Sequence, residues 1–145
     1  MRHNIWHVHS HFTTLPVIKK PTVLIIEDDA IARLSVNKII GRDERLEVLD
    51  AGTGAEAIEL SERFRIDLVI ADIILGAEDG IAVAQRVLAS HNADLIFLSA
   101  VSDVAREERA TALKPRAFLQ KPVDEAALQR AVEEALAGLG RDQFA

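Results

Sequence analysis

The chain has 145 residues, 49% of them hydrophobic and 28% charged, which fits one folded domain with a core and argues against disorder. Its formal net charge of −6 at pH 7, without a cluster of Lys and Arg, argues against direct nucleic-acid binding. It contains no cysteine, which excludes disulfides, cysteine-ligated zinc and thiol catalysis.

The first 20 residues differ in composition from the rest of the chain. They contain four of the five histidines and the single tryptophan, Trp6. His7, His9 and His11 would share one side of an extended strand, as in a metal-binding tract, but we favour a disordered extension. The segment has no apolar stretch typical of a signal peptide, and no run in the chain is long enough to span a membrane. We therefore expect a cytoplasmic protein with no membrane contact.

Five short apolar runs follow this extension, and most of them show no polar alternation. Such runs are typical of strands that are covered on both faces in a parallel sheet. The predicted strands are Val23–Ile26, Leu46–Ala51, Leu68–Ala71, Leu95–Leu98 and Ala117–Leu119.

Apolar residues at helical spacing separate the strands. The predicted helices are centred on Ala32–Ile40, Ala57–Phe64, Ile81–Leu88, Asp103–Leu113 and Leu128–Leu136. Asp124 is the expected N-cap of the last helix, which should end before Gly138. The Asp103–Leu113 helix has a thin apolar face, so we expect it to be the loosest element.

Alternating strands and helices predict a doubly wound α/β fold of the (βα)5 type. We expect this domain to cover residues 21–138, between the extension of residues 1–20 and a short tail of residues 139–145. In such folds the functional groups lie beyond the carboxyl ends of the strands. The residues at those ends are therefore the candidate site.

Polar side chains follow four of the five predicted strands. They are Glu27, Asp28, Asp29, Asp72, Ser99 and Lys121. If the first and third strands are neighbours, several carboxylates converge there and repel one another, so a cation is expected. A site with two carboxylates, waters and a phosphate oxygen suits Mg²⁺.

These residues lie within motifs that resemble those of the response-regulator receiver family. The motifs are Val-Leu-Ile-Ile-Glu-Asp-Asp at 23–29, Asp-Leu-Val-Ile-Ala-Asp-Ile at 67–73 followed by Glu78-Asp79-Gly80, Phe97-Leu98-Ser99-Ala100, and Phe118-Leu119-Gln120-Lys121-Pro122. The resemblance covers about Pro21 to Leu136. It implies a flavodoxin-like fold with a five-stranded parallel sheet in the order 2-1-3-4-5.

The resemblance also implies an acceptor and a magnesium site. It makes Asp72 the phosphoryl acceptor, with Asp28 and Asp72 as direct Mg²⁺ ligands. Glu27 would act through a water, and Ile74 would contribute its backbone carbonyl. Three consecutive acids leave Asp28/Asp29 open as an alternative pair, but we favour Glu27/Asp28 because Asp29 then fits as a helix N-cap.

The same resemblance implies a cradle for the phosphoryl group. Lys121 and the Ser99 hydroxyl would each bind a phosphoryl oxygen, together with the amides of Ile74 and Ala100. Members usually have a cis peptide bond before the proline that matches Pro122, which would direct the lysine into the site.

Three positions depart from the family pattern. Gly76 stands where proline is common, so the loop after the acceptor is expected to be more mobile. Ser99 replaces the commoner threonine and keeps the hydroxyl. Phe118 occupies the aromatic switch position often held by tyrosine, so it cannot form a hydroxyl bond at the surface.

The resemblance implies a regulator that accepts a phosphoryl group from a histidine kinase or a histidine phosphotransfer protein, rather than a metabolic enzyme. Only about nine residues follow Leu136, so we expect a stand-alone domain that signals through a protein target. In the family the face of the fourth helix, fifth strand and fifth helix does this, and a phosphorylation-dependent dimer is a further option.

Three other functions remain as alternatives. Gly52-x-Gly54-x-x-Ala57 matches the local dinucleotide-binding pattern, but it follows the second strand, so we interpret its glycines as turn residues. An aspartyl-phosphate hydrolase would share the nucleophile and lysine, but such enzymes need a second acid where Ile74 stands. A receiver-like interaction module that is never phosphorylated is the third alternative.

Overall fold

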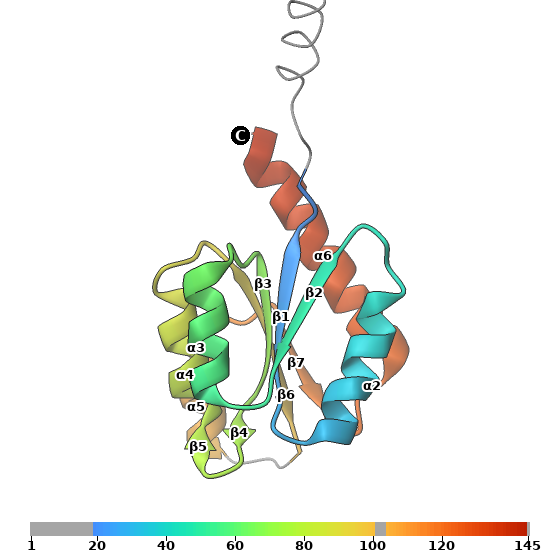
Figure 1. Ribbon diagram of the computed structural model, residues 1–145. Helices are drawn as coiled ribbons and strands as arrows, with labels where there is room; N and C mark the ends of the chain where they lie inside the picture. Colours follow the sequence, from blue (N-terminus) through green and yellow to red (C-terminus); the bar gives the residue numbers. More distant parts are fainter. Residues whose placement is uncertain (1–18, 101–103, 145) are drawn as a thin grey trace, which may run out of the picture.

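A five-stranded parallel sheet forms the centre of the computed structural model, which describes residues 19–100 and 104–144 (Figure 1). Its strands are β1 (Thr22–Ile26), β2 (Glu47–Ala51), β3 (Leu68–Asp72), β6 (Asp94–Ser99) and β7 (Ala117–Gln120). They lie in the order β2-β1-β3-β6-β7, and every pairing is parallel. Counted along the chain, this is the order 2-1-3-4-5, so the predicted fold class is confirmed.

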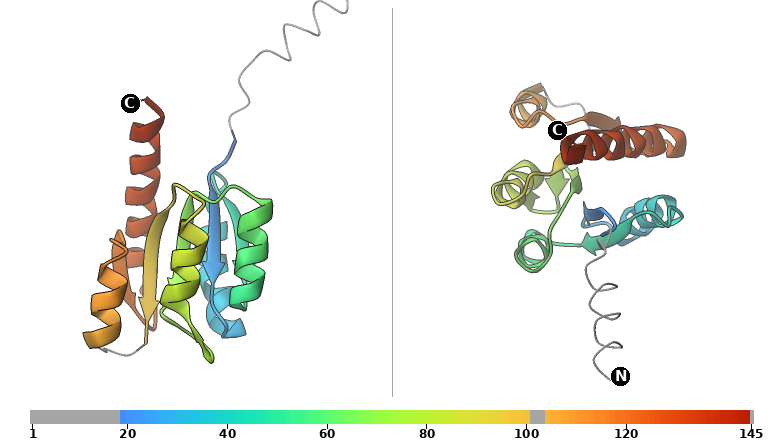
Figure 2. Two further views of the ribbon diagram at one scale, coloured as in Figure 1. Left: turned by 90° about the vertical axis from the view of Figure 1, so that its left-hand side faces the viewer. Right: turned by 90° about the horizontal axis from the view of Figure 1, so that it is seen from above.

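Helices cover both faces of the sheet, as Figure 2 shows from above. They are α2 (Ala30–Gly41), α3 (Gly54–Arg63), α4 (Gly80–Leu88), α5 (Val104–Thr111) and α6 (Glu125–Phe144). Helices α2 and α6 pack on one face, and α3, α4 and α5 lie on the other. None of the helices in the described ranges is both long and apolar enough to be a membrane span.

The sheet separates two hydrophobic cores because successive side chains of a strand point to opposite faces. In β1, Val23 and Ile25 pack towards α2 and α6, whereas Leu24 and Ile26 pack towards the other three helices. All five residues of β3 are buried. Burial on both faces explains why these strands lack polar alternation, and each buried Leu or Ile contributes roughly 1.5–3 kcal/mol.

The two last helices differ in how they are packed. Helix α5 buries a single residue, Ala110, which agrees with its thin apolar face. The α6 helix begins after Asp124, whose side chain accepts a hydrogen bond from the Ala127 amide at 2.9 Å, as expected of an N-cap. The expected end before Gly138 is wrong, because the helix continues to Phe144. A glycine weakens a helix by only about 1 kcal/mol, which neighbouring turns can offset.

The loop after Asp72 forms a short β-hairpin that the sequence did not reveal. Strands β4 (Ile74–Leu75) and β5 (Glu78–Asp79) pair antiparallel, and Gly76 at the turn has a φ of 60°. Strands of two residues are too short to show alternation, so pattern reading misses them. The loop that contains Gly76 is therefore a paired turn.

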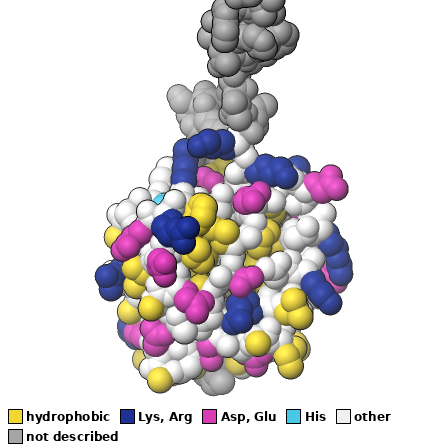
Figure 3. Space-filling model, in the orientation of Figure 1, with side chains coloured by type: hydrophobic (Ala, Val, Ile, Leu, Met, Phe, Trp, Pro, Cys, Tyr) yellow, Lys and Arg dark blue, Asp and Glu magenta, His cyan; other side chains and the backbone are white. Residues whose placement is uncertain are grey.

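The surface carries mixed charges on the face shown in Figure 3, where basic and acidic side chains alternate across the described residues. Several Lys and Arg side chains lie next to one another along the upper edge of the described residues in this view.

Gly80 is the tightest glycine position among those described, which predicts a sharp difference between two glycine substitutions. A β-carbon at Gly80 would lie 1.9 Å from the carbonyl oxygen of Asp72, whereas one at Gly41 would lie 3.5 Å from its nearest neighbour, on Asn37. We expect Gly80→Ala to lower the free energy of unfolding by about 3 kcal/mol or more. Gly41→Ala should change it by less than about 1 kcal/mol. Urea unfolding of both variants tests this, and similar values would contradict it.

Candidate functional site

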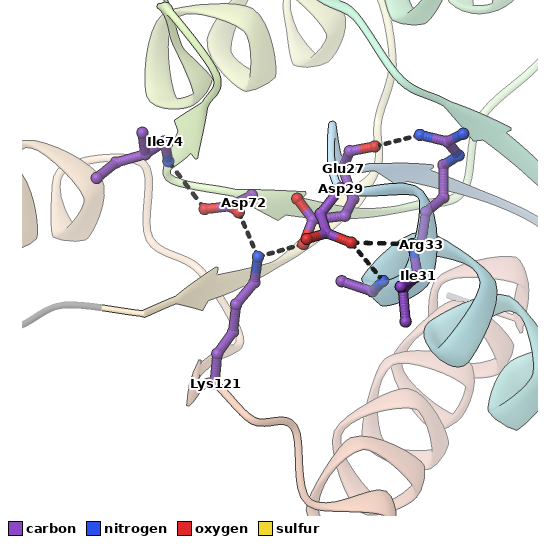
Figure 4. A network of polar contacts seen from close by, with 8 residues as sticks. Glu27, Asp29, Ile31, Arg33, Asp72, Ile74 and Lys121 are labelled. Carbon is purple, nitrogen blue, oxygen red and sulfur yellow. Dashed lines mark hydrogen bonds and ion pairs between the residues drawn. The ribbon is translucent and has the colours of Figure 1, made fainter.

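The candidate site lies at the carboxyl edge of the sheet, where neighbouring parallel strands end side by side (Figure 4). Ile26 of β1 is in register with Ala71 of β3, so the residues that follow them meet at this edge. Glu27, Asp28 and Asp72 each offer a carboxylate oxygen, and these oxygens lie within 4.8 Å of one another. The predicted convergence of the acids therefore occurs.

Lys121 supplies the positive charge in this cluster. Its Nζ donates hydrogen bonds to Glu27 Oε1 and Asp72 Oδ2. The Lys121 backbone amide donates a hydrogen bond to the Ser99 carbonyl at 2.8 Å. Lys121 therefore lies directly after the last residue of β7 that pairs with β6. The Lys121–Pro122 peptide bond is cis, as the resemblance implied.

Glu27 is the deeply buried member of the cluster, with no exposed surface. Burial raises its pKa to about 7, against the opposing effect of Lys121 and with further repulsion from Asp72. Its Oε2 atom is buried and has no hydrogen-bond partner within the described part of the chain. A buried acceptor without a donor is costly. Two further carboxylates are within reach, so the donor set fits a hard divalent cation with oxygen ligands.

The two aspartates after Glu27 have different surroundings. Asp28 is exposed and belongs to the cluster. Asp29 caps α2 instead, because its Oδ1 accepts hydrogen bonds from the amides of Ile31 at 2.9 Å and Ala32 at 3.0 Å. These amide bonds hold the Asp29 pKa below its usual value. The arrangement favours Glu27/Asp28 over Asp28/Asp29 as the metal pair.

The loop after the third strand completes one side of the site. The Ile74 amide donates to Asp72 Oδ1 at 2.9 Å, so the two oxygens of this carboxylate have different donors. Asp72 itself is 6% exposed, and Ile74 is 36% exposed. This amide is one of the two that the family resemblance implies for the phosphoryl cradle.

The other cradle residues follow β6. Ser99 ends the strand and is half-buried, and Ala100 after it is exposed. Phe118 on the neighbouring strand β7 is 37% exposed, with its ring centroid 5.6 Å from that of Phe97. Residues 101–103 lie outside the described part of the chain, so the site is described on this side only up to Ala100.

Arg33 is a residue of the site that the sequence did not indicate. Its Nη1 donates to the Glu27 backbone carbonyl at 2.8 Å, and its Nε lies 3.5 Å from Asp50 Oδ1. It thus connects the acidic end of β1 to the end of β2. One arginine on an amphipathic helix is typical of a solvent-exposed face, so no pattern distinguished it.

The glycines of the dinucleotide-like motif have structural roles. Gly54 starts α3, and its amide donates to Glu78 Oε1 at 3.0 Å. The Gly52 amide donates to Glu56 Oε2 at 3.0 Å, and Thr53 caps the helix through the Glu56 amide. Carboxylates of the chain therefore occupy the amides that a bound pyrophosphate would need, which supports the interpretation as turn glycines.

Comparison with known proteins identifies related sequences. The family model for the response regulator receiver domain matches residues 23–133. The transcriptional regulatory protein PdtaR of Mycobacterium tuberculosis is 36% identical over 115 residues, which are 79% of this chain and 56% of that protein. The chain thus aligns with little more than half of that relative's length.

Solved structures share the fold. The signal receiver domain of a modulated diguanylate cyclase from Desulfovibrio desulfuricans G20 superposes with a TM-score of 0.76 at 32% identity, covering 86% of this chain and 99% of that one. A CheY-like response regulator receiver domain protein from Methanospirillum hungatei JF-1 superposes with a TM-score of 0.79, with the same coverage of both chains. Its 20% identity supports the fold alone.

The raised pKa of Glu27 predicts an unusual pH dependence of stability in metal-free protein. Between pH 4.5 and 7 the folded state keeps a proton on Glu27 that the unfolded chain releases, so this group's contribution to stability falls as the pH rises. We expect wild type to lose on the order of 1–3 kcal/mol relative to Glu27→Gln across this range. Urea unfolding of both proteins with a chelator at pH 5, 6 and 7 measures the difference between their free energies of unfolding. The contributions of other titrating groups cancel in this difference. A constant difference would refute the prediction.

Proposed function

Because this chain belongs to the response regulator receiver domain family, we propose that Asp72 accepts a phosphoryl group from a histidine kinase or a histidine phosphotransfer protein. Receiver domains are signalling domains rather than metabolic enzymes. The observation that carries the proposal is the setting of the Asp72 carboxylate, which Lys121 Nζ and the Ile74 amide contact at the edge where Glu27 and Asp28 converge.

The proposed reaction moves one phosphoryl group between two side chains. An Asp72 carboxylate oxygen attacks the phosphorus of a phosphohistidine, the P–O bond forms, and the P–N bond breaks. The bonding electron pair stays on the imidazole nitrogen of the donor. Lys121 and the Ile74 amide would then neutralise and bind the oxygens of the transferred group, with the Ser99 hydroxyl and the Ala100 amide as further donors. Such a transfer needs placement and charge neutralisation more than other covalent assistance.

We propose that Mg²⁺ is the cofactor, because the donor set fits it and receiver domains generally use it. Asp28 and Asp72 would hold the ion directly, Glu27 through a water, and Ile74 through its carbonyl. The bound ion would supply positive charge against the carboxylates and the phosphoryl oxygens. The orphaned Glu27 Oε2 supports this role, because water held by a cation would give it a donor.

The phosphodonor needs a surface beside Asp72, and the first turns of α2 offer one. Ile31 and Leu34 are 82% and 57% exposed. Ile31 also lines a hollow of about 350 Å³ that reaches Lys121 and Pro122. We propose that the kinase or phosphotransfer protein covers these apolar side chains when it presents its histidine, since their burial would contribute to binding.

Receiver domains generally also contact a downstream target, and for this chain we propose the face of α5, β7 and α6. Helix α5 buries only Ala110, and Phe118 is partly exposed on β7, the edge strand that follows α5 in the chain. A phosphoryl group that draws Ser99 inward would vacate space for the Phe118 ring. Phosphorylation-dependent dimerisation through this face is part of the same proposal. Burying the ring would offset the cost of moving α5.

An aspartyl-phosphate hydrolase is less consistent with the residues beside Asp72. Position 74 carries an isoleucine, which is 36% exposed and donates only its backbone amide to the carboxylate. The side chain of Ile74 therefore cannot act as the second acid of such an enzyme. A receiver-like module that is never phosphorylated would not be labelled at Asp72, whereas the proposed regulator would be.

The acceptor is tested by Asp72→Asn, with Asp94→Asn as the matched control. Asp94 begins β6 at the opposite edge of the sheet and pairs with Arg116. We expect Asp72→Asn to lose all acid-labile, hydroxylamine-sensitive labelling from acetyl phosphate or a histidine kinase, because the amide is not a nucleophile. Asp94→Asn should be labelled like wild type. Full labelling of Asp72→Asn, or none of wild type, would contradict the proposal.

The route from Asp72 to the output face predicts separable effects at two positions. Ser99→Ala should still be phosphorylated at Asp72 but should transmit little change, and Phe118→Ala should uncouple labelling from partner binding. The measurement is amide chemical shift across residues 100–120, with and without the phosphoryl mimic beryllium fluoride, where coupling of about 1–3 kcal/mol is typical. Changes in wild type that stay confined to residues touching the mimic would show that this route is wrong.

A further inference from the structure

The two residues of β5 each bind the N-terminus of a different helix. Glu78 Oε1 accepts a hydrogen bond from the Gly54 amide at the start of α3, at 3.0 Å. Asp79 Oδ1 accepts one from the Ile81 amide in the first turn of α4, also at 3.0 Å. Carboxylates bind well at helix N-termini because the free amides and the helix dipole favour negative charge. The β4–β5 hairpin is thus held between two helix ends.

The contact between Glu78 and α3 leaves no space for a side chain at Gly54. A β-carbon at Gly54 would lie 2.4 Å from Glu78 Oε2 and 2.8 Å from Val83 Cγ2. Both distances are shorter than β-carbons tolerate from any heavy atom, so the missing side chain permits the approach. Gly54 is buried, although Glu78 lies at the surface. An added β-carbon would therefore displace the Glu78 carboxylate from its place at the start of α3.

The hairpin connects this contact to the acceptor. Glu78 is in register with Leu75, and Asp79 is in register with Ile74. The amide of Ile74 contacts Asp72 Oδ1, and at the turn a β-carbon on Gly76 would lie 3.3 Å from Asp28 Oδ2. One short hairpin therefore contacts Asp72 directly and passes close to Asp28, and Glu78 anchors its returning strand.

We propose that Glu78 is a positioning residue, whose bond to the start of α3 keeps Ile74 in place against Asp72 and thereby strengthens Mg²⁺ binding. Glu78 itself contacts neither the acceptor nor the ion. The part of this inference that concerns Mg²⁺ rests on the proposed function, whereas the part that concerns Ile74 rests on the hairpin alone. Without the anchor, the Ile74 amide and carbonyl would sample positions away from the site, and ligand binding would have to order them.

Three variants separate the anchor from the charge of Glu78. Glu78→Gln keeps an oxygen that can accept from the Gly54 amide but removes the charge. Glu78→Ala removes both. Gly54→Ala keeps the charge but displaces the carboxylate from the helix. Glu62→Ala, which removes an exposed carboxylate near the other end of α3, is the matched control.

The first measurement is hydrogen exchange of the Ile74 amide in metal-free protein. We expect exchange to be about 10-fold faster in Glu78→Ala and Gly54→Ala, since the loss of one hydrogen bond corresponds to a factor of about this size. Glu78→Gln and Glu62→Ala should stay within about 3-fold of wild type. Unchanged exchange in Glu78→Ala would overturn the proposal whatever the metal results are. If Gly54→Ala does not fold, Glu78→Ala and Glu78→Gln still decide the point.

The second measurement is the Mg²⁺ dissociation constant from NMR titration. It should rise roughly 3- to 10-fold in Glu78→Ala and Gly54→Ala and remain near the wild-type value in Glu78→Gln. Equal weakening in Glu78→Gln and Glu78→Ala, with Gly54→Ala like wild type, would assign the effect to charge and overturn the proposed positioning. Asp28→Ala should abolish binding. Wild type that binds no Mg²⁺ would refute the proposed cofactor, and the exchange measurement would then decide the anchor by itself.

Discussion

The burial of Glu27 is the constraint on which the rest of the site depends, because removing a carboxylate from water is energetically unfavourable. A carboxylate with no exposed surface is stable only when charges and donors replace water. Lys121 donates a hydrogen bond to one Glu27 oxygen, and the other oxygen has no donor in the described residues. The pKa of Glu27 is raised because these contacts do not fully compensate for its burial. Arg33 stabilises the backbone of the same residue from the opposite side. A bound cation would neutralise the remaining negative charge of the cluster, so the burial of Glu27 favours metal binding at this edge of the sheet.

Much of the fold could be predicted because the central strands β1, β3 and β6 are buried on both faces. Runs such as Val23–Ile26 and Leu68–Ala71 have no polar interruption, and a buried parallel sheet is what such runs favour. The convergence of Glu27, Asp28, Asp72 and Lys121 was predictable for the same reason, since parallel strands end at one edge. The strand order, however, came from the family motifs. Periodicity alone does not distinguish it from other doubly wound orders.

Features that depend on single contacts could not be predicted. Strands β4 and β5 have two residues each, and Glu78 and Arg33 look like ordinary surface charges until their partners in space are known. Helix α6 passes Gly138 because one glycine near the end of a helix is only a weak stop signal. The His-rich metal tract suggested for residues 7–11 lies outside the described residues.

The shallow attachment of α5 has a consequence for how the sequence can change during evolution. Ala110 alone is buried in this helix, so most substitutions along it remove little apolar contact and should be close to neutral for folding. Residues of α3, α4 and α6 that pack against the sheet lack this freedom. A helix that can vary without loss of the fold is well suited to acquire new binding specificities, while the strand ends that carry the acids stay under constraint.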